Sequence, residues 1–76
     1  MKAVEVDVRG LSCSAAVVRV HRALVPLARG ASVRVLTDDP TLLIDLKAFA
    51  ARGGHSVRGT KGLASGALEV EVRKGA

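Results

Sequence analysis

Three segments of the chain alternate between aliphatic and polar residues, and this alternation constrains the fold more than any other feature. A period of two residues predicts β-strands with one buried face and one solvated face. A sheet covered on both faces would instead show continuous apolar runs. The helices are therefore expected to lie on one face of the sheet only. The three segments are VEVDV (4–8), SVRVLT (32–37) and ALEVEVR (67–73).

A fourth, shorter strand is expected at His55–Thr60, around Val57. The alternation also assigns side chains to the two faces of the sheet. The residues expected to face the helices are Val4, Val6, Val8, Val33, Val35, Val57, Leu68, Val70 and Val72. Those expected to face water are Glu5, Asp7, Arg34, Glu69, Glu71 and Arg73.

The first of two expected helices runs from about Ser14 to Ala28, where apolar residues recur at three- and four-residue spacing. Ser12 is a suitable N-cap, because its hydroxyl can accept a hydrogen bond from a free N–H of the first turn. Gly30 is a suitable stop. Pro26 falls in the last turn, where a proline removes one backbone hydrogen bond.

The second expected helix begins at the sequence DDP, with Asp39 as N-cap and Pro40 at the first helical position, and ends at Gly53. The order along the chain is therefore strand, helix, strand, helix, strand, strand. At 76 residues the chain has the length of one small domain, with a core of valine, leucine and alanine.

Composition excludes several classes of protein. A single cysteine, Cys13, cannot form an internal disulfide, which favours a reducing, cytoplasmic setting. Charged residues in the first ten positions argue against a signal peptide. The formal net charge of +5 makes acidic partners plausible. Single-stranded nucleic-acid binders usually stack bases on aromatic rings, however, and Phe49 is the only aromatic residue.

The topology gathers several polar residues at one edge of the sheet. In a right-handed βαβ unit the first two strands are parallel, so the segments that follow them lie at the same edge. Cys13 follows the first strand and Asp38–Asp39 the second. If the third strand runs parallel to these two, the loop after it returns to this edge and brings Lys61. His55, after the second helix, is expected at the opposite end.

This placement argues against three kinds of site. A cysteine hydrolase needs a histidine in contact with the thiol, but His21 lies about 12 Å further along the expected helix. One cysteine and two scattered histidines form no zinc-ligand cluster. The sequence GTKG (59–62) matches the GxxG loop of KH domains, but that loop joins two helices and this one joins two strands. No cofactor is expected.

Cys13 is therefore the candidate reactive group. Free N–H groups and the positive end of the dipole at a helix N-terminus favour a thiolate and would lower the cysteine pKa. Arg9 is expected to add positive potential. The residues alone leave a second interpretation equally open, in which Cys13 is a small residue that packs at the helix entrance.

The sequence DVRGLSC before the first helix, VRVLTDDP before the second, then FAARGGHSV and LEVEVRK, resembles the TusA/SirA-like sulfur-carrier family over nearly the whole chain. The resemblance implies one domain over residues 1–76, an α/β (α+β) two-layer sandwich of order βαβαββ, with two helices on one face of a four-stranded mixed sheet. It also implies that Cys13 carries a persulfide. The family's Cys-Pro-x-Pro motif is Cys13-Ser14-Ala15-Ala16 here, so both prolines are missing.

The resemblance implies a sulfur carrier rather than a stand-alone catalyst. Its donor would be a cysteine desulfurase or a rhodanese-type protein, and its acceptor would serve tRNA thiolation, molybdenum-cofactor maturation or sulfur metabolism. Two alternatives remain open: a basic module that binds RNA or a protein, and a subunit that only activates an enzyme. Weak nucleic-acid binding and no membrane association are expected. The candidate docking residues around the thiol are Arg9, Ser12, Ser14, Arg19, Arg22, Asp38, Asp39 and Lys61.

Overall fold

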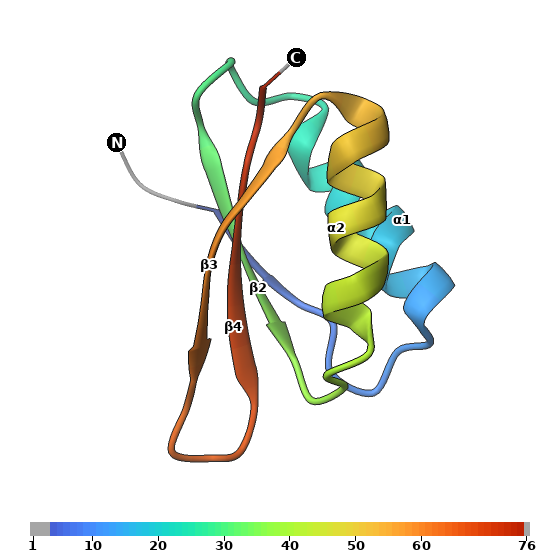
Figure 1. Ribbon diagram of the computed structural model, residues 1–76, viewed down its shortest axis with the longest axis vertical. Helices are drawn as coiled ribbons and strands as arrows, with labels where there is room; N and C mark the ends of the chain where they lie inside the picture. The colour runs from blue at the N-terminus through green and yellow to red at the C-terminus, as the bar shows by residue number, and fades with distance from the viewer. Residues whose placement is uncertain (1–3, 76) are drawn as a thin grey trace.

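A computed structural model describes residues 4–75 of the protein and places both helices on the same face of a single sheet (Figure 1). The predicted α+β two-layer sandwich is confirmed. Neither helix among the described residues is long and apolar enough to cross a membrane. The elements are β1 (Val4–Asp7), α1 (Cys13–Leu24), β2 (Ser32–Thr37), α2 (Leu42–Gly53), β3 (Ser56–Gly62) and β4 (Leu68–Arg73).

The four strands form a mixed sheet in the order β1-β2-β4-β3. β1 pairs parallel with β2, and β4 pairs antiparallel with both β2 and β3. β3 therefore runs in the same direction as β2, although β4 lies between them. The hairpin that joins β3 and β4 consequently returns to the edge of the sheet at which β1 and β2 end, as predicted (Figure 1).

The core lies between the sheet and the two helices, and the alternation predicts its members well. Val57 and Leu68, also predicted to face inward, are half-buried. Val4 is 38% exposed, because it is the first residue of an edge strand and has a strand neighbour on one side only. The fully buried core residues include Val8, Val20, Leu24, Val33, Val35, Leu42, Leu46, Val70 and Val72.

The open face of the sheet carries the predicted polar residues, all exposed except Glu69, which is half-buried. In register across the strands, Glu5 lies beside Arg34, and Arg34 lies beside Glu71. Asp7 and Glu69 flank Leu36 in the next row of the same face. Four of the chain's seven carboxylates therefore lie on the side away from the helices.

α1 ends at Leu24, four residues before the predicted end at Ala28. Pro26 explains the difference, because its ring has no N–H to donate and clashes with the carbonyl one turn earlier. The Lys74 ammonium instead donates to the carbonyls of Val25 (3.0 Å) and Leu27 (2.7 Å), which the shortened helix leaves open. β3 extends to Gly62 rather than Thr60.

α2 begins at Leu42, two residues later than predicted. Leu42 and Leu43 each donate to the carbonyl three residues earlier, so a 3₁₀ turn precedes the regular helix. The N-cap of α2 is therefore Thr41 rather than the predicted Asp39, while Oδ1 of Asp39 accepts from the Thr41 N–H at 2.9 Å and caps the preceding turn. At the other end, Gly54 has φ 77° and closes the helix in the left-handed conformation.

Candidate functional site

Cys13 is the first residue of α1, and its neighbours fix the start of that helix. Ser12 has extended backbone angles, and its Oγ accepts from the Ala15 N–H at 3.3 Å, so the predicted N-cap is confirmed. The Ser14 hydroxyl lies 3.4 Å from that of Ser12. The cysteine is thus held at a capped helix N-terminus.

Ala16 stands where the family motif has its second proline. Its N–H donates to the Ser12 carbonyl at 2.9 Å, a bond that a proline could not make, and its side chain is buried in the core. Ala16 therefore starts the hydrogen-bonded ladder of α1 one step earlier than a proline would allow.

The thiol lies between the N-termini of the two helices. Sγ of Cys13 is 3.6 Å from Oδ2 of Asp39 and 3.6 Å from Oγ1 of Thr41, both from the turn before α2. Thr41 Oγ1 also donates to Asp39 at 2.6 Å, so the three side chains form one small network. Cys13 is half-buried and packs against the core. The thiol is thus less exposed than a freely presented group would be.

The electrostatics of this network oppose the expected thiolate. The hydrogen bond from Thr41 lowers the pKa of Cys13. The carboxylates of Asp45 and Asp39 and partial burial raise it, and their combined effect is larger than that of Thr41. The net result is a pKa above the ordinary value, so the prediction of a lowered pKa was wrong. The cause lies at the start of α2, which approaches the thiol. Acids stabilise a helix N-terminus, and two of them, Asp39 and Asp45, therefore lie close to the sulfur. At neutral pH the resting group is a protonated thiol.

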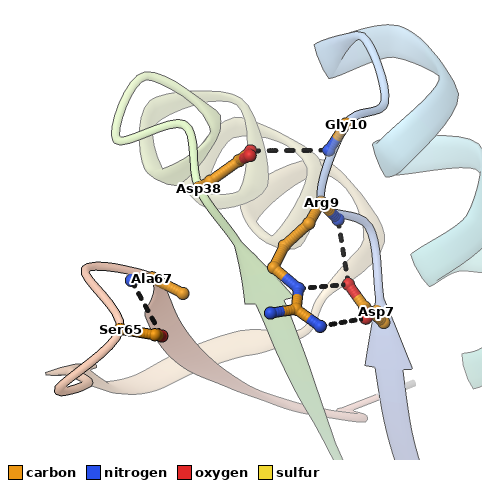
Figure 2. Close-up of polar contacts among 6 residues, drawn as sticks. All are labelled: Asp7, Arg9, Gly10, Asp38, Ser65 and Ala67. Atoms are coloured by element: carbon orange, nitrogen blue, oxygen red, sulfur yellow. Dashed lines mark hydrogen bonds and ion pairs between the residues drawn. The ribbon is translucent and has the colours of Figure 1, made fainter.

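Arg9 does not add positive potential at the thiol, contrary to the prediction. Its guanidinium folds back onto Asp7, with contacts of 3.0 Å and 2.7 Å, as Figure 2 shows. This pair lowers the pKa of Asp7 to about 2, first through the side-chain hydrogen bond from Arg9. The Asp38 side chain points toward Gly10, and its Oδ1 accepts a hydrogen bond from the Gly10 N–H at 3.5 Å (Figure 2). These contacts fix the loop between β1 and α1.

Lys61 returns to the predicted edge of the sheet but is not brought to the thiol. It lies on β3, and β2 and β4 separate that strand from β1. It pairs in register with Glu69, and its neighbour Thr60 pairs with buried Val70. Lys61 therefore belongs to the open face of the sheet, whereas Cys13 belongs to the helical layer. The nearby tip of the hairpin is closed by a contact from Ala67 to Ser65 (Figure 2).

Arg19 and Arg22 lie on the exposed side of α1, as predicted. With Ser14 and Val18, they line a shallow hollow of about 550 Å³ that begins one residue after the cysteine. Val18 is 50% exposed, so the hollow also offers an apolar contact beside the two cations. Of the predicted docking residues, Ser14, Arg19 and Arg22 form one continuous surface.

Thr41 and Asp45 contribute to the environment of the thiol and were missed from the sequence. Their spacing of four residues places both on one face of a helix, which was the available signal. That this face points at Cys13 depends on how α2 packs against α1. Within residues 4–75, no three His, Cys, Asp or Glu side chains are placed so that they could hold a metal ion.

The sequence also missed a cluster at the opposite end of the molecule. Phe49 lies between two imidazoles, with ring centroids 5.9 Å from His21 and 5.6 Å from His55. His55 is at the end predicted for it. His21 comes from the other helix, and no sequence pattern links it to Phe49 and His55.

Comparisons with known proteins agree with the geometry. The family model described as sulfurtransferase TusA matches residues 4–74. The crystal structure of a SirA-like protein from Desulfitobacterium hafniense superposes with a TM-score of 0.82 and 27% sequence identity, covering 96% of this chain and 99% of that one. No match is found among curated proteins. Because the family model spans all six elements, the chain belongs to the sulfurtransferase TusA family.

Proposed function

We propose that this protein is a sulfur carrier in which Cys13 receives sulfur as a persulfide and passes it to an acceptor. The observation that carries the proposal is the position of the sole cysteine, at the first residue of α1 in a chain matched to the TusA family over residues 4–74. The donor would be a cysteine desulfurase or a rhodanese-type protein. The acceptor would belong to tRNA thiolation, molybdenum-cofactor maturation or sulfur metabolism, and the carrier would act in the cytoplasm as a single domain over residues 1–76.

The transfer needs no external oxidant or reductant. The Cys13 thiolate attacks the outer sulfur of a donor persulfide, a new S–S bond forms on Cys13, and the donor's inner sulfur leaves as a thiolate. The proton that Cys13 loses can be taken up by the thiolate that the donor releases. In the transfer to the acceptor, an acceptor thiolate attacks the outer sulfur on Cys13, and Cys13 leaves as a thiolate.

The carboxylates beside the thiol support a protected resting state of this carrier. Thr41 lowers the pKa of Cys13, but Asp45, partial burial and Asp39 together raise it above its ordinary value, so the free protein holds little thiolate at neutral pH. A thiol of this kind reacts slowly with oxidants and stray electrophiles. A bound donor must therefore promote loss of the proton, and the oxygen atoms next to the thiol are Oδ2 of Asp39 and Oγ1 of Thr41, each 3.6 Å from Sγ.

The hollow on α1 is the proposed docking surface for the donor. Arg19 and Arg22 offer two cations and Val18 an apolar contact beside the thiol, which suits an acidic partner surface with a central apolar group. The open sheet face mixes four carboxylates with Arg34, Arg73 and Lys61, so it offers no continuous cationic surface for phosphates. An RNA-binding sheet surface therefore has less support than a protein partner.

The proposal is tested by incubating the protein with a cysteine desulfurase and free cysteine, then measuring intact mass. The wild-type protein is expected to gain the mass of one sulfur atom, which a reductant removes, and Cys13→Ser is expected to gain nothing. Arg19→Glu and Arg22→Glu should slow loading by about tenfold, whereas Lys47→Glu, on the exposed side of α2, should load normally. A chain that stays unmodified while the desulfurase carries its own persulfide, and likewise with a rhodanese donor, contradicts the proposal.

A further inference from the structure

A second concave site lies at the end of the molecule opposite Cys13. It is an open groove of about 470 Å³, lined by residues from the C-terminal parts of both helices and by Lys74. Figure 1 shows that both helices end close to the last residues of β4. This volume is within the range of small-molecule sites. The lining residues are His21, Leu24, Val25, Phe49, Arg52, Gly53, His55 and Lys74.

The floor of the groove is apolar and partly open to solvent. Phe49 is half-buried, and Val25 is 60% exposed although it lies next to buried Leu24. The His21 ring meets the Phe49 ring edge-on, at an interplanar angle of 84°. A flat or branched apolar group lying on this floor would cover surface that is now exposed to water.

The His55 imidazole lies at the rim and is positioned by one hydrogen bond and one close contact. Its Nδ1 accepts from the Gly75 N–H at 3.2 Å, so in the neutral ring the proton is on Nε2. The ring lies so close to Gly53 that a Cβ there would be 2.8 Å from Cδ2 and 2.9 Å from Nε2. Glycine at this position is therefore required for the ring to lie where it does.

All the charge that lines the groove is positive. Arg52 and Lys74 are the two cations, and no aspartate or glutamate is among the lining residues. The Lys74 ammonium already donates to two backbone carbonyls, whereas Arg52 is exposed in the last turn of α2. The Arg52 guanidinium is thus the group that can pair with an anion of a ligand.

We propose that this groove binds a small organic anion, with its apolar body on Phe49, Leu24 and Val25 and its carboxylate or sulfonate on Arg52. The site is independent of the proposed sulfur transfer, because none of its residues contacts Cys13. A small molecule fits better than a protein surface, since the groove is concave and of limited volume rather than flat and extended.

The test uses two probes with the same ring system. One is 8-anilino-1-naphthalenesulfonate, and the other is N-phenyl-1-naphthylamine, which lacks the sulfonate. Fluorescence titration of the folded wild-type protein should give a dissociation constant on the order of 10–100 µM for the anion. The neutral probe should bind at least about tenfold more weakly.

Variants locate the binding. Arg52→Gln should weaken binding of the anion by about tenfold, and Lys47→Gln on the same helix should leave it unchanged. Gly53→Ala, which displaces the His55 ring, should alter binding and also shift the His55 imidazole resonances in the NMR spectrum. Cys13→Ser should bind the probe as the wild-type protein does.

Several outcomes would overturn the proposal. These are equal binding of the two probes, equal effects of Arg52→Gln and Lys47→Gln, or no saturable binding below about 1 mM. Amide shift changes confined to residues outside the groove would also overturn it. So would a dimer, detected by analytical ultracentrifugation, that covers Val25 and excludes the probe. Circular dichroism of each variant separates loss of binding from loss of folding.

Discussion

The two ends of the helical layer differ in what the helices place there. At the Cys13 end, both helices begin, and the thiol lies among Asp39, Thr41 and Asp45. At the other end both helices stop, and aromatic and cationic side chains surround Phe49. Each end follows the helix dipole, with acids near N-termini and bases near C-termini.

This difference shows how stability and reactivity compete at a helix terminus. The free N–H groups of a helix favour a thiolate, but they equally favour the carboxylates that cap the helix. At Cys13 the acid that caps the turn before α2 lies within 3.6 Å of the sulfur and opposes the thiolate. At the far end there is no such conflict, because the cations that suit the helix C-termini also suit an anionic ligand.

The strongest way to sharpen the comparison is to remove one side chain from each end. Phe49→Ala should lower the free energy of unfolding by about 2 kcal/mol, less than a fully buried phenylalanine because the ring is half-exposed. Cys13→Ala should lower it by about 1 kcal/mol or less. Urea unfolding followed by circular dichroism measures both. Equal losses would mean that the thiol end contributes as much packing as the aromatic end.

A smaller effect is expected when the acid beside the thiol is neutralised. Asp39→Asn should lower the pKa of Cys13, because one of the groups that raise it loses its charge. Alkylation at pH 7 should then accelerate by roughly threefold for each unit of pKa, since the gain in thiolate is partly offset by lower nucleophilicity. A pH–rate profile with iodoacetamide gives both quantities.

Asp38→Asn is the matched control, because Asp38 faces the Gly10 N–H rather than the sulfur. If the two variants accelerate alkylation equally, the effect is general surface charge, and the contact between Asp39 and Cys13 has no special role. Asparagine at position 39 can still accept from the Thr41 N–H, so α2 should keep its start.

The smallest effect is expected for the exposed ion pair next to the thiol loop. Asp7 has a pKa of about 2 in the folded protein, below its ordinary value of 3.8, so its pairing stabilises the fold above pH 4 and is lost as the pH falls through about 2. Arg9→Gln should therefore reduce the melting temperature only slightly near neutral pH, because exposed pairs contribute little. The difference between the two proteins should disappear toward pH 2. A difference that persists at pH 2 would assign Arg9 a role other than this pair.

Local patterns predicted the elements of the fold. The predicted bounds were wrong where one or two residues shift the end of a helix. The valine alternation identified the strands and the solvated face because side-chain direction in a strand repeats every two residues. Pro26 shortened α1, and the turn at Asp39 and Pro40 delayed α2. These boundaries depend on hydrogen bonds that a pattern of apolar residues does not contain.

The sequence by itself determined that Cys13 lies at the entrance of a helix after the first strand and that the helices cover one face of the sheet. Only the tertiary structure decided what surrounds the sulfur and what forms the distant groove. Asp39 reaches Cys13 across 26 residues, and Phe49 meets His21 across the packing of α1 on α2. Periodicity is a property of neighbours in the chain, whereas the pKa of a thiol and the charge of a groove are set by groups that folding brings together.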